Sequence, residues 1–218
     1  MGQIQHFTRE QQLILDKIAN NPFLTNTFYF TGGTALSYFY LHHRISDDID
    51  LFSETEFDPQ EISSLIARWA DELSFTYSAR TNHTMFIYFL TFPNGIELKL
   101  DFVYYPYHRI EKGAHYHALP VDSFKDIAVN KIITVNQRDE VKDFVDLYFI
   151  LKSHTIWDLL AGAEHKFKMP IDRVLLASDL LKSSYFTTLP KMLLPLEIEE
   201  LKAVFADLAT KLGQSSFE

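Results

Sequence analysis

The sequence predicts an α+β fold, in which a small mixed β-sheet flanked by helices is followed by a C-terminal helical lobe. Up to residue 104 the chain alternates between strand-like runs and helical segments, and from residue 121 onward it shows helical periodicity alone. Of the 218 residues, 47% are hydrophobic, which suffices for a substantial core. We therefore expect a core at residues 1–119 and a helical lobe at residues 120–218, with a cleft between them.

The first strand of the core leads directly into a glycine turn. Residues 28–30 are an apolar run typical of a short buried strand, and Gly32-Gly33 predicts a tight turn after it. A helix is expected over residues 35–42, followed by a second strand over residues 48–52. Such a turn offers backbone amides to phosphate.

Two further helices of the core carry N-terminal signals. Thr8 and Gln11 can form a capping box for a helix over residues 8–18. Asp58-Pro59 is a capping residue followed by proline, and it predicts the start of a second helix. The apolar face of that helix consists of Ile62, Leu65, Ile66 and Trp69.

The rest of the core is predicted to be an antiparallel meander. Strand-like runs occupy residues 75–80, 85–92 and 96–104, and Pro93-Asn94-Gly95 supplies the turn between the last two. Residues 108–117 lack periodicity and are expected to form a loop or a strand edge. The helices expected after them span residues 122–137, 139–152, 156–167, 171–181 and 196–212.

Composition excludes several classes of protein. The absence of cysteine excludes disulfides, thiolate metal sites and thiol nucleophiles. A formal net charge of −9 argues against a broad basic surface for nucleic acid. The N-terminal sequence has no basic region followed by an apolar run, and no segment approaches the ~20 apolar residues of a membrane span. We therefore expect a soluble cytoplasmic protein that does not bind membranes.

Two aspartates on the second predicted strand are the leading candidates for metal ligands. The period of two in a strand points Asp48 and Asp50 to one face, while Ile49 and Leu51 face the core. Two carboxylates that can share a hard cation, close to amides that can hold a triphosphate, are what a metal-dependent nucleotidyl transfer requires.

A third carboxylate is expected from the strand at residues 96–104. Its alternation places Glu97, Lys99 and Asp101 on the polar face, and we choose Asp101 as the third ligand. Asp48, Asp50 and Asp101 could then hold two Mg²⁺ ions about 4 Å apart, with Mn²⁺ as a substitute. The competing interpretation is that Asp101 is an exposed carboxylate paired with Lys99.

A glycine turn, a D-x-D strand and a later single aspartate, in that order, resemble the polymerase-beta-like nucleotidyltransferase superfamily. More narrowly, three segments resemble the AbiEii/AbiGii toxin family of nucleotidyltransferases; they are TGGTAL at residues 31–36, HRISDDIDLF at 43–52 and KIITVNQRDEVKDFVDLYFIL at 131–151. The resemblance covers residues 28–151. It implies a bilobed enzyme with a nucleoside triphosphate as donor and, in many members, a toxin role opposed by a separate antitoxin protein. Some relatives modify the acceptor ends of tRNA.

The resemblance also implies roles for individual residues. Lys131 would hold the donor phosphates, and Asp146 would orient the acceptor hydroxyl or accept its proton. Gly32, Gly33 and Thr34 would grip phosphate through amides and a hydroxyl, although Thr34 could merely cap the helix.

Charged residues of the third segment form two facing sets. Lys131 and Arg138 share a face of one helix, and an acidic stripe of Asp139, Asp143 and Asp146 on the next helix could meet them across the turn. A solvated acidic face is the competing explanation for Asp143 or Asp146. Arg44 and Ser46 match the family and are interpreted as anchors of their loop.

Two other functions stay open. The acceptor could be a small molecule or a protein hydroxyl instead of RNA, or the chain could be a non-catalytic nucleotide-binding or antitoxin-like module. Retention of Asp48, Asp50 and Asp101 argues against the module. Zinc is disfavoured because the histidines lack tight ligand spacing; they are His42, His43, His108, His115 and His117.

Overall fold

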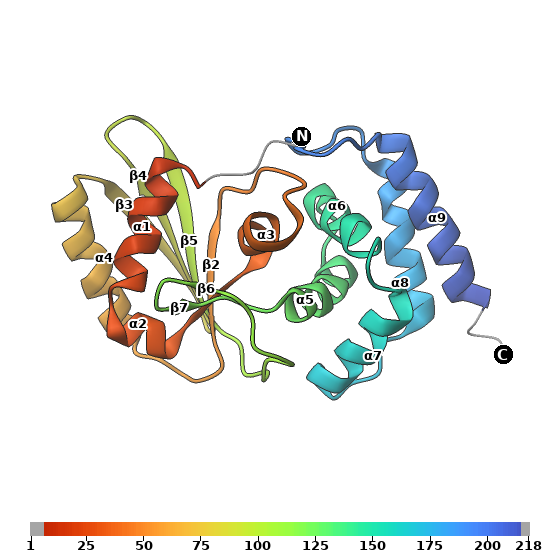
Figure 1. The fold of residues 1–218 in the computed structure, drawn as a ribbon, viewed down its shortest axis with the longest axis horizontal. Helices are drawn as coiled ribbons and strands as arrows, with labels where there is room; N and C mark the ends of the chain where they lie inside the picture. Colours follow the sequence, from red (N-terminus) through yellow and green to blue (C-terminus); the bar gives the residue numbers. More distant parts are fainter. Residues whose placement is uncertain (1–6, 215–218) are drawn as a thin grey trace.

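The protein, described by a computed structural model over residues 7–214, is built around a mixed sheet with the strand order β1-β2-β5-β4-β3 (Figure 1). The strands are β1 (Tyr29–Thr31), β2 (Ile49–Ser53), β3 (Thr76–Asn82), β4 (Met85–Thr91) and β5 (Glu97–Tyr104). Strand β2 runs parallel to β5, and the other neighbouring pairs are antiparallel. The predicted mixed sheet and meander are therefore confirmed.

The helices follow the predicted segments closely. They are α1 (Arg9–Ala19), α2 (Pro22–Thr27), α3 (Gly32–Leu36), α4 (Pro59–Leu73), α5 (Phe124–Gln137), α6 (Val141–Ile150), α7 (Ile156–Phe167), α8 (Arg173–Leu180) and α9 (Ile198–Gln214). Thr8 and Gln11 form the predicted capping box of α1, and Asp58 caps α4. Two helices of the described residues were not expected, α2 and the 3-10 helix η2 (Leu181–Tyr185). Asn21 caps α2, and Pro22 occupies its first position.

The period of two divides the sheet into an apolar face and a polar face. Ile49, Leu51 and Leu100 are fully buried on the apolar face. Helix α4 contributes the predicted stripe of Ile62, Leu65, Ile66 and Trp69 to the same core. In Figure 1, α1, α2 and α4 lie on one side of the sheet, and α5 to α9 form a lobe on the other side, beyond α3. The polar face of β2 and β5 is left for the site.

The helix expected over residues 35–42 differs from the prediction in two ways. It starts earlier, at Gly32, and it continues after Leu36 as a π-helical turn, η1 (Ser37–Leu41). The π-helical turn closes with a hydrogen bond of 2.8 Å from the His42 amide to the Ser37 carbonyl. His42 has a left-handed conformation with φ of 49°. This residue ends the helix and turns the chain toward β2.

The chain passes from the sheet to the helical lobe along β1. Residues 105–114 are irregular, as expected, and a short pair of strands, β6 (His115–Tyr116) and β7 (Leu119–Pro120), follows. Val121 then bridges to Phe30, whose carbonyl accepts a hydrogen bond of 2.8 Å from the Asp122 amide. The predicted boundary at residues 119–120 thus falls in a segment that is hydrogen-bonded to the sheet.

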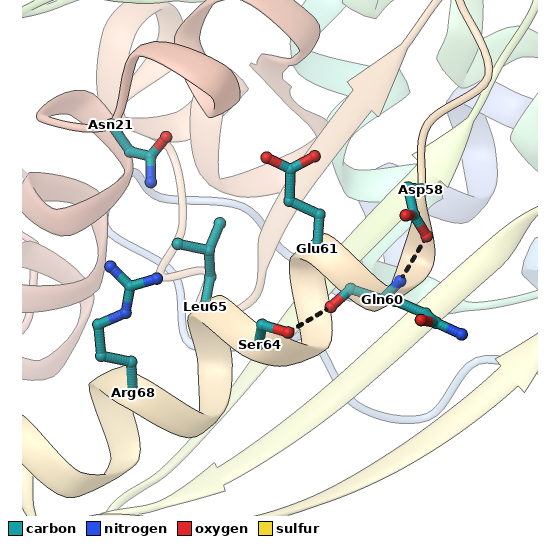
Figure 2. A pocket seen from close by; sticks show the side chains of 7 residues that line it. All are labelled: Asn21, Asp58, Gln60, Glu61, Ser64, Leu65 and Arg68. Atoms are coloured by element: carbon teal, nitrogen blue, oxygen red, sulfur yellow. Dashed lines mark hydrogen bonds between the residues drawn. The ribbon is translucent and has the colours of Figure 1, made fainter.

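A small cavity of about 510 Å³ lies at the start of α4, away from the polar face of the sheet (Figure 2). Two of the polar side chains shown there serve the helix itself. Asp58 accepts from the Gln60 amide at 2.9 Å, and Ser64 donates to the Gln60 carbonyl at 2.8 Å. Within residues 7–214, no helix combines the length and the apolar character needed to cross a bilayer.

Candidate active site

A cavity of about 830 Å³ opens between the polar face of the sheet and the helical lobe. Its walls come from β2 and β5, the start of α3, helices α5 and α6, and the segment from Phe167 to Asp172 that leads into α8. A volume of roughly 300–1,000 Å³ is typical of small-molecule and cofactor sites. The cavity therefore has room for a nucleotide.

Four polar side chains form a block on the cavity face of β2 and β5. Asp50 is the register partner of Asp101 across this parallel pair. Asp48 and Lys99 each lie two residues earlier in the chain, so they share the same face beside that pair. All four residues line the cavity. The three predicted carboxylates are therefore brought together, and a lysine stands with them; we call these four residues the carboxylate block.

Burial and mutual repulsion set the charges in the carboxylate block. Burial and, after it, the neighbouring Asp101 together raise the pKa of Asp50 to about 6. Asp101 is only 4% exposed, and burial raises its pKa as well, although the ion pair with Lys99 opposes the rise. Burial disfavours the Lys99 ammonium, but Asp101, Asp50 and Asp48 together raise its pKa. A cation would relieve the excess negative charge.

The donor atoms of the carboxylate block suit a hard divalent cation. Asp101 Oδ1 is buried without a hydrogen-bond partner, which is rare for a carboxylate oxygen and leaves it available to a cation. Asp48 is 35% exposed toward the cavity. Within residues 7–214, no three carboxylate or histidine side chains already converge on a single point. Asp48, Asp50 and Asp101 fit the cation by ligand type and by shared face.

Both glycines of the turn are required, because a Cβ atom at either position would clash with side chains of the site. Gly32 has φ of 78°, and a Cβ there would lie 2.0 Å from Asp50 Oδ2. A Cβ on Gly33 would lie 2.5 Å from Arg44 Nη2 and 3.1 Å from Ser46 Oγ. Only glycine allows the turn to approach Asp50 so closely.

Gly32→Ala is expected to be more harmful than Gly95→Ala, which serves as its matched control. Both glycines have a positive φ, 78° and 81°, but a Cβ at Gly95 meets nothing within 4 Å. Gly95→Ala should cost about 1–2 kcal/mol from the backbone conformation alone. Gly32→Ala should cost a further 1–3 kcal/mol or so, because the methyl group must displace the Asp50 carboxylate. Urea unfolding of both variants measures the difference, and equal losses would contradict the predicted clash.

Thr34 does not contribute the phosphate-binding hydroxyl that the sequence suggested. Its side chain is fully buried, and its hydroxyl donates to the Asp48 carbonyl. Thr34 is absent from the cavity wall, whereas Gly32 and Gly33 belong to it. The hydroxyl therefore positions the backbone of Asp48.

Asp146 is the centre of a buried ion network behind the cavity wall. Arg44 approaches it with two nitrogens, Nε to Oδ1 at 2.6 Å and Nη2 to Oδ2 at 2.9 Å. Lys131 Nζ lies 2.6 Å from Oδ2, and His43 Nε2 lies 2.7 Å from Oδ1. Burial lowers the pKa of His43, so a neutral ring donates through Nε2. Asp146 is bonded to Arg44, Lys131 and His43 and does not line the cavity. It therefore positions these side chains and does not contact the acceptor.

Asp143 extends this network to the mouth of the cavity. Lys131 Nζ lies 2.7 Å from Asp143 Oδ1, and Arg138 Nε lies 2.7 Å from Asp143 Oδ2. The predicted meeting of Lys131 and Arg138 with the acidic stripe is confirmed for Asp143 and Asp146, but not for Asp139, which is exposed and lies before the start of α6. The alternative of a solvated acidic face is wrong, because Asp143 and Asp146 are both fully buried. Each carboxylate is buried together with the cations that neutralise it.

The C-terminal part of the chain supports the loop that carries Arg44. The Ile45 amide donates to the Lys191 carbonyl at 2.8 Å, and the Leu193 amide donates to the His43 carbonyl at 2.8 Å. Arg44 itself forms a bridge with Met192. The sequence after residue 151 carries no recognisable motif, because hydrogen bonds between backbone atoms do not require particular side chains.

Sequence reasoning also missed parts of the cavity wall. Lys99 was considered only as a rival partner for Asp101, although the same alternation places it on the site face. Lys142 Nζ lies 3.8 Å from Asp48 Oδ2, and although Lys142 belongs to the segment at residues 131–151, no role was predicted for it. An aromatic end of the cavity joins Tyr107 to Phe167, whose ring centroids are 4.8 Å apart. These two rings lie 60 positions apart, so only the fold brings them together.

A mixed sheet that presents carboxylates on neighbouring strands, next to a glycine turn and above a nucleotide-sized cavity, defines a nucleotidyltransferase. The family described as "Nucleotidyl transferase AbiEii toxin, Type IV TA system" matches residues 13–212. The chain is also similar to an uncharacterized protein of Aquifex aeolicus (strain VF5), with 36% identity over 155 residues that cover 69% of each chain.

Two solved structures share the fold. JHP933 from Helicobacter pylori superposes with a TM-score of 0.54 at 18% identity, covering 97% of each chain. A putative nucleotidyltransferase from H. pylori superposes with a TM-score of 0.58 at 18% identity, covering 94% of this chain and 92% of that one. These two structures share the fold, and the family match over residues 13–212 places the chain plainly: it belongs to the AbiEii toxin family of nucleotidyltransferases.

Proposed function

We propose that this protein transfers a nucleoside monophosphate from a nucleoside triphosphate to an acceptor hydroxyl and releases pyrophosphate. The observation that supports this most is the carboxylate block, whose Asp48, Asp50 and Asp101 share one cavity face with the glycine turn against Asp50. These carboxylates would hold Mg²⁺ or Mn²⁺. When bound, the cation supplies charge neutralisation on the phosphates and lowers the pKa of the acceptor hydroxyl.

The bonds change in one displacement at the α-phosphorus. The acceptor oxygen attacks this atom, and the bond from it to the bridging oxygen of the β-phosphate breaks. Pyrophosphate leaves with that electron pair, and the hydroxyl proton passes to solvent water. The carboxylate oxygens of the block, Asp101 Oδ1 among them, are then left for the cation.

The other wall of the cavity supplies positive charge for the leaving pyrophosphate. The cations of this wall are Arg44, Lys131, Arg138 and Lys142, and their carboxylate partners on it are Asp143, Asp146 and Glu140, so four cations meet three carboxylates and one positive charge remains. Lys131 lines the cavity but is bonded to both carboxylates, so it acts as part of this network rather than as a free lysine. Fixed positive charge stabilises the transition state as charge develops on the leaving group. The amides of Gly32 and Gly33 add donors for phosphate.

The proposal extends to the biological role of the reaction. Family membership suggests a toxin–antitoxin role, and we propose that the chain acts in the cytoplasm as a toxin, on RNA such as tRNA, and is opposed by a cognate antitoxin. The aromatic end of the cavity at Tyr107 and Phe167 offers ring faces against which a base can stack. The net charge of −9 favours a small-molecule or protein acceptor as the second candidate.

The test is transfer of label from each α-³²P nucleoside triphosphate, with Mg²⁺, into total RNA, protein and small-molecule fractions. Asp48→Ala should abolish transfer. Asp47→Ala is the matched control, because Asp47 neighbours Asp48 but is exposed and lies outside the cavity wall, and it should keep full activity. The labelled fraction identifies the acceptor class. Absence of label from every fraction, with the wild-type protein and chelator-sensitive nucleotide binding intact, would favour the non-catalytic module.

A further inference from the structure

Lys99 has a position in the carboxylate block that the proposed reaction leaves unused. It projects from β5 on the same face as Asp101, and its ammonium is bonded to Asp101 Oδ2. Its side chain is 30% exposed and lines the cavity. The ammonium therefore lies where a cation ligand and the substrate phosphates are both within its reach.

The surroundings of Lys99 are acidic. Asp50 and Asp48 act on it electrostatically in addition to Asp101. Asp101 thus gives one oxygen to the ammonium, while its second oxygen, Oδ1, is buried without a hydrogen-bond partner. An ammonium and a divalent cation compete for one carboxylate, because both are attracted to its negative charge and, being positive, repel each other.

The other two lysines near the carboxylates differ from Lys99. Lys131 is 8% exposed in its side chain and is held by Asp143 and Asp146, so it is fixed in the wall. Lys142 lies 3.8 Å from Asp48 Oδ2 and 3.2 Å from Glu140 Oε2, at the rim of the cavity. Among these three, Lys99 alone is hydrogen-bonded to a carboxylate of the block, because Lys142 approaches Asp48 only to 3.8 Å.

We propose that Lys99 competes with a divalent cation for Asp101, and that cation binding redirects its ammonium to the phosphates of the nucleotide. The first half depends only on the carboxylate block, and the second half rests on the proposed function. Lysine suits such a transfer because its charge is compact and its four-carbon stem is flexible. Cation and nucleotide binding are then coupled through one side chain.

The experiment measures Mn²⁺ binding by electron paramagnetic resonance, without nucleotide, in the wild type, Lys99→Met, Lys99→Arg and Lys142→Met. Lys99→Met should bind Mn²⁺ about tenfold more tightly, because a competing charge is removed from a partly screened site. Lys99→Arg keeps the charge and should stay near the wild type. Lys142→Met, which removes an equal charge at the rim, should change the affinity less than Lys99→Met.

The melting temperature and the nucleotide affinity of the same variants provide two further tests. In chelator, Lys99→Met should melt at a lower temperature than the wild type, because its carboxylates lose their ion-pair partner, and Mn²⁺ should raise its melting temperature by a larger increment. With saturating Mn²⁺, Lys99→Met should bind α,β-methylene nucleoside triphosphates about tenfold more weakly, since a charge-assisted bond to phosphate is lost.

The outcomes separate this inference from the proposed function. Unchanged or weaker Mn²⁺ binding by Lys99→Met, with binding intact in the wild type, would overturn the competition while leaving the proposed function standing. Tighter Mn²⁺ binding with undiminished nucleotide affinity would overturn the transfer to phosphate. Failure of the wild type and every variant to bind Mn²⁺ would overturn both the competition and the metal dependence of the proposed reaction.

Discussion

Asp101→Asn is expected to reduce the rate of nucleotidyl transfer by about a thousandfold or more, which corresponds to about 4 kcal/mol of transition-state stabilisation. The asparagine keeps the shape of the side chain but removes the negative charge and replaces one carboxylate oxygen with a nitrogen that binds Mg²⁺ poorly. The fold should remain intact, because burial already disfavours the charged form of Asp101.

Initial rates of pyrophosphate release measure this effect. Glu97→Gln is the matched control, because Glu97 lies on the same strand four residues earlier, on the same face, but is exposed and lies outside the cavity wall. It should keep the wild-type rate. If Asp101→Asn retained more than about a tenth of the activity, a central role for this carboxylate in a metal-assisted reaction would be untenable.

Asp146→Asn is expected to lower the free energy of unfolding by about 3–5 kcal/mol. The substitution leaves the buried guanidinium of Arg44 without the charge that compensates it, and it leaves Lys131 with Asp143 as its remaining carboxylate. Removing one partner of a buried ion pair lowers the free energy of unfolding far more than removing one partner of an exposed pair. Asp207→Asn is the control, since Asp207 pairs with Lys211 at 2.6 Å while about 62% exposed, and it should produce no measurable change.

The effect of Asp146→Asn should depend on pH. Burial alone would raise the pKa of Asp146, but Lys131, Arg44 and His43 hold it well below its usual range. A carboxylate with a lowered pKa contributes stability above its unfolded-state pKa of about 3.9, and this contribution is lost as pH falls toward the folded-state value. Urea unfolding at neutral pH and below about pH 3.5 should show the difference between wild type and variant shrinking with acid. A difference that stays constant over this range would argue against an ionised Asp146.

Local sequence signals were enough to predict most of the elements and the shared polar face of the three carboxylates proposed as metal ligands. Alternation on residues 48–52 and 96–103 placed Asp48, Asp50 and Asp101 on polar strand faces, and the structure pairs Asp50 with Asp101 in register. Capping residues predicted the starts of α1 and α4, since a cap is a contact between neighbours in the chain. Caps and strand alternation can be identified in a single sequence because they depend on residues that are neighbours in the chain.

The environment of each charge could not be predicted in the same way. Asp143 and Asp146 lie on a helix face that resembles a solvated one, and only their partners on α5 and in the loop at residues 43–45 explain why they are buried. Thr34 follows the glycine pair as a phosphate-binding residue would, yet its hydroxyl meets the Asp48 carbonyl 14 residues away. Burial depends on contacts between distant segments, and periodicity does not contain that information.

The two halves of the molecule are joined on both sides of the cavity. On one side, the Asp122 amide and carboxylate bond to Phe30 and Thr31, the strand that precedes the glycine turn. On the other side, Arg44 bonds to Asp146, and its loop pairs with residues 191–193. Opening the cleft as a hinge would break these bonds, several of them buried and charged. These contacts hold the carboxylate block and the wall that carries Arg44, Lys131 and Arg138 at a set separation, so the width of the cavity is built into the fold.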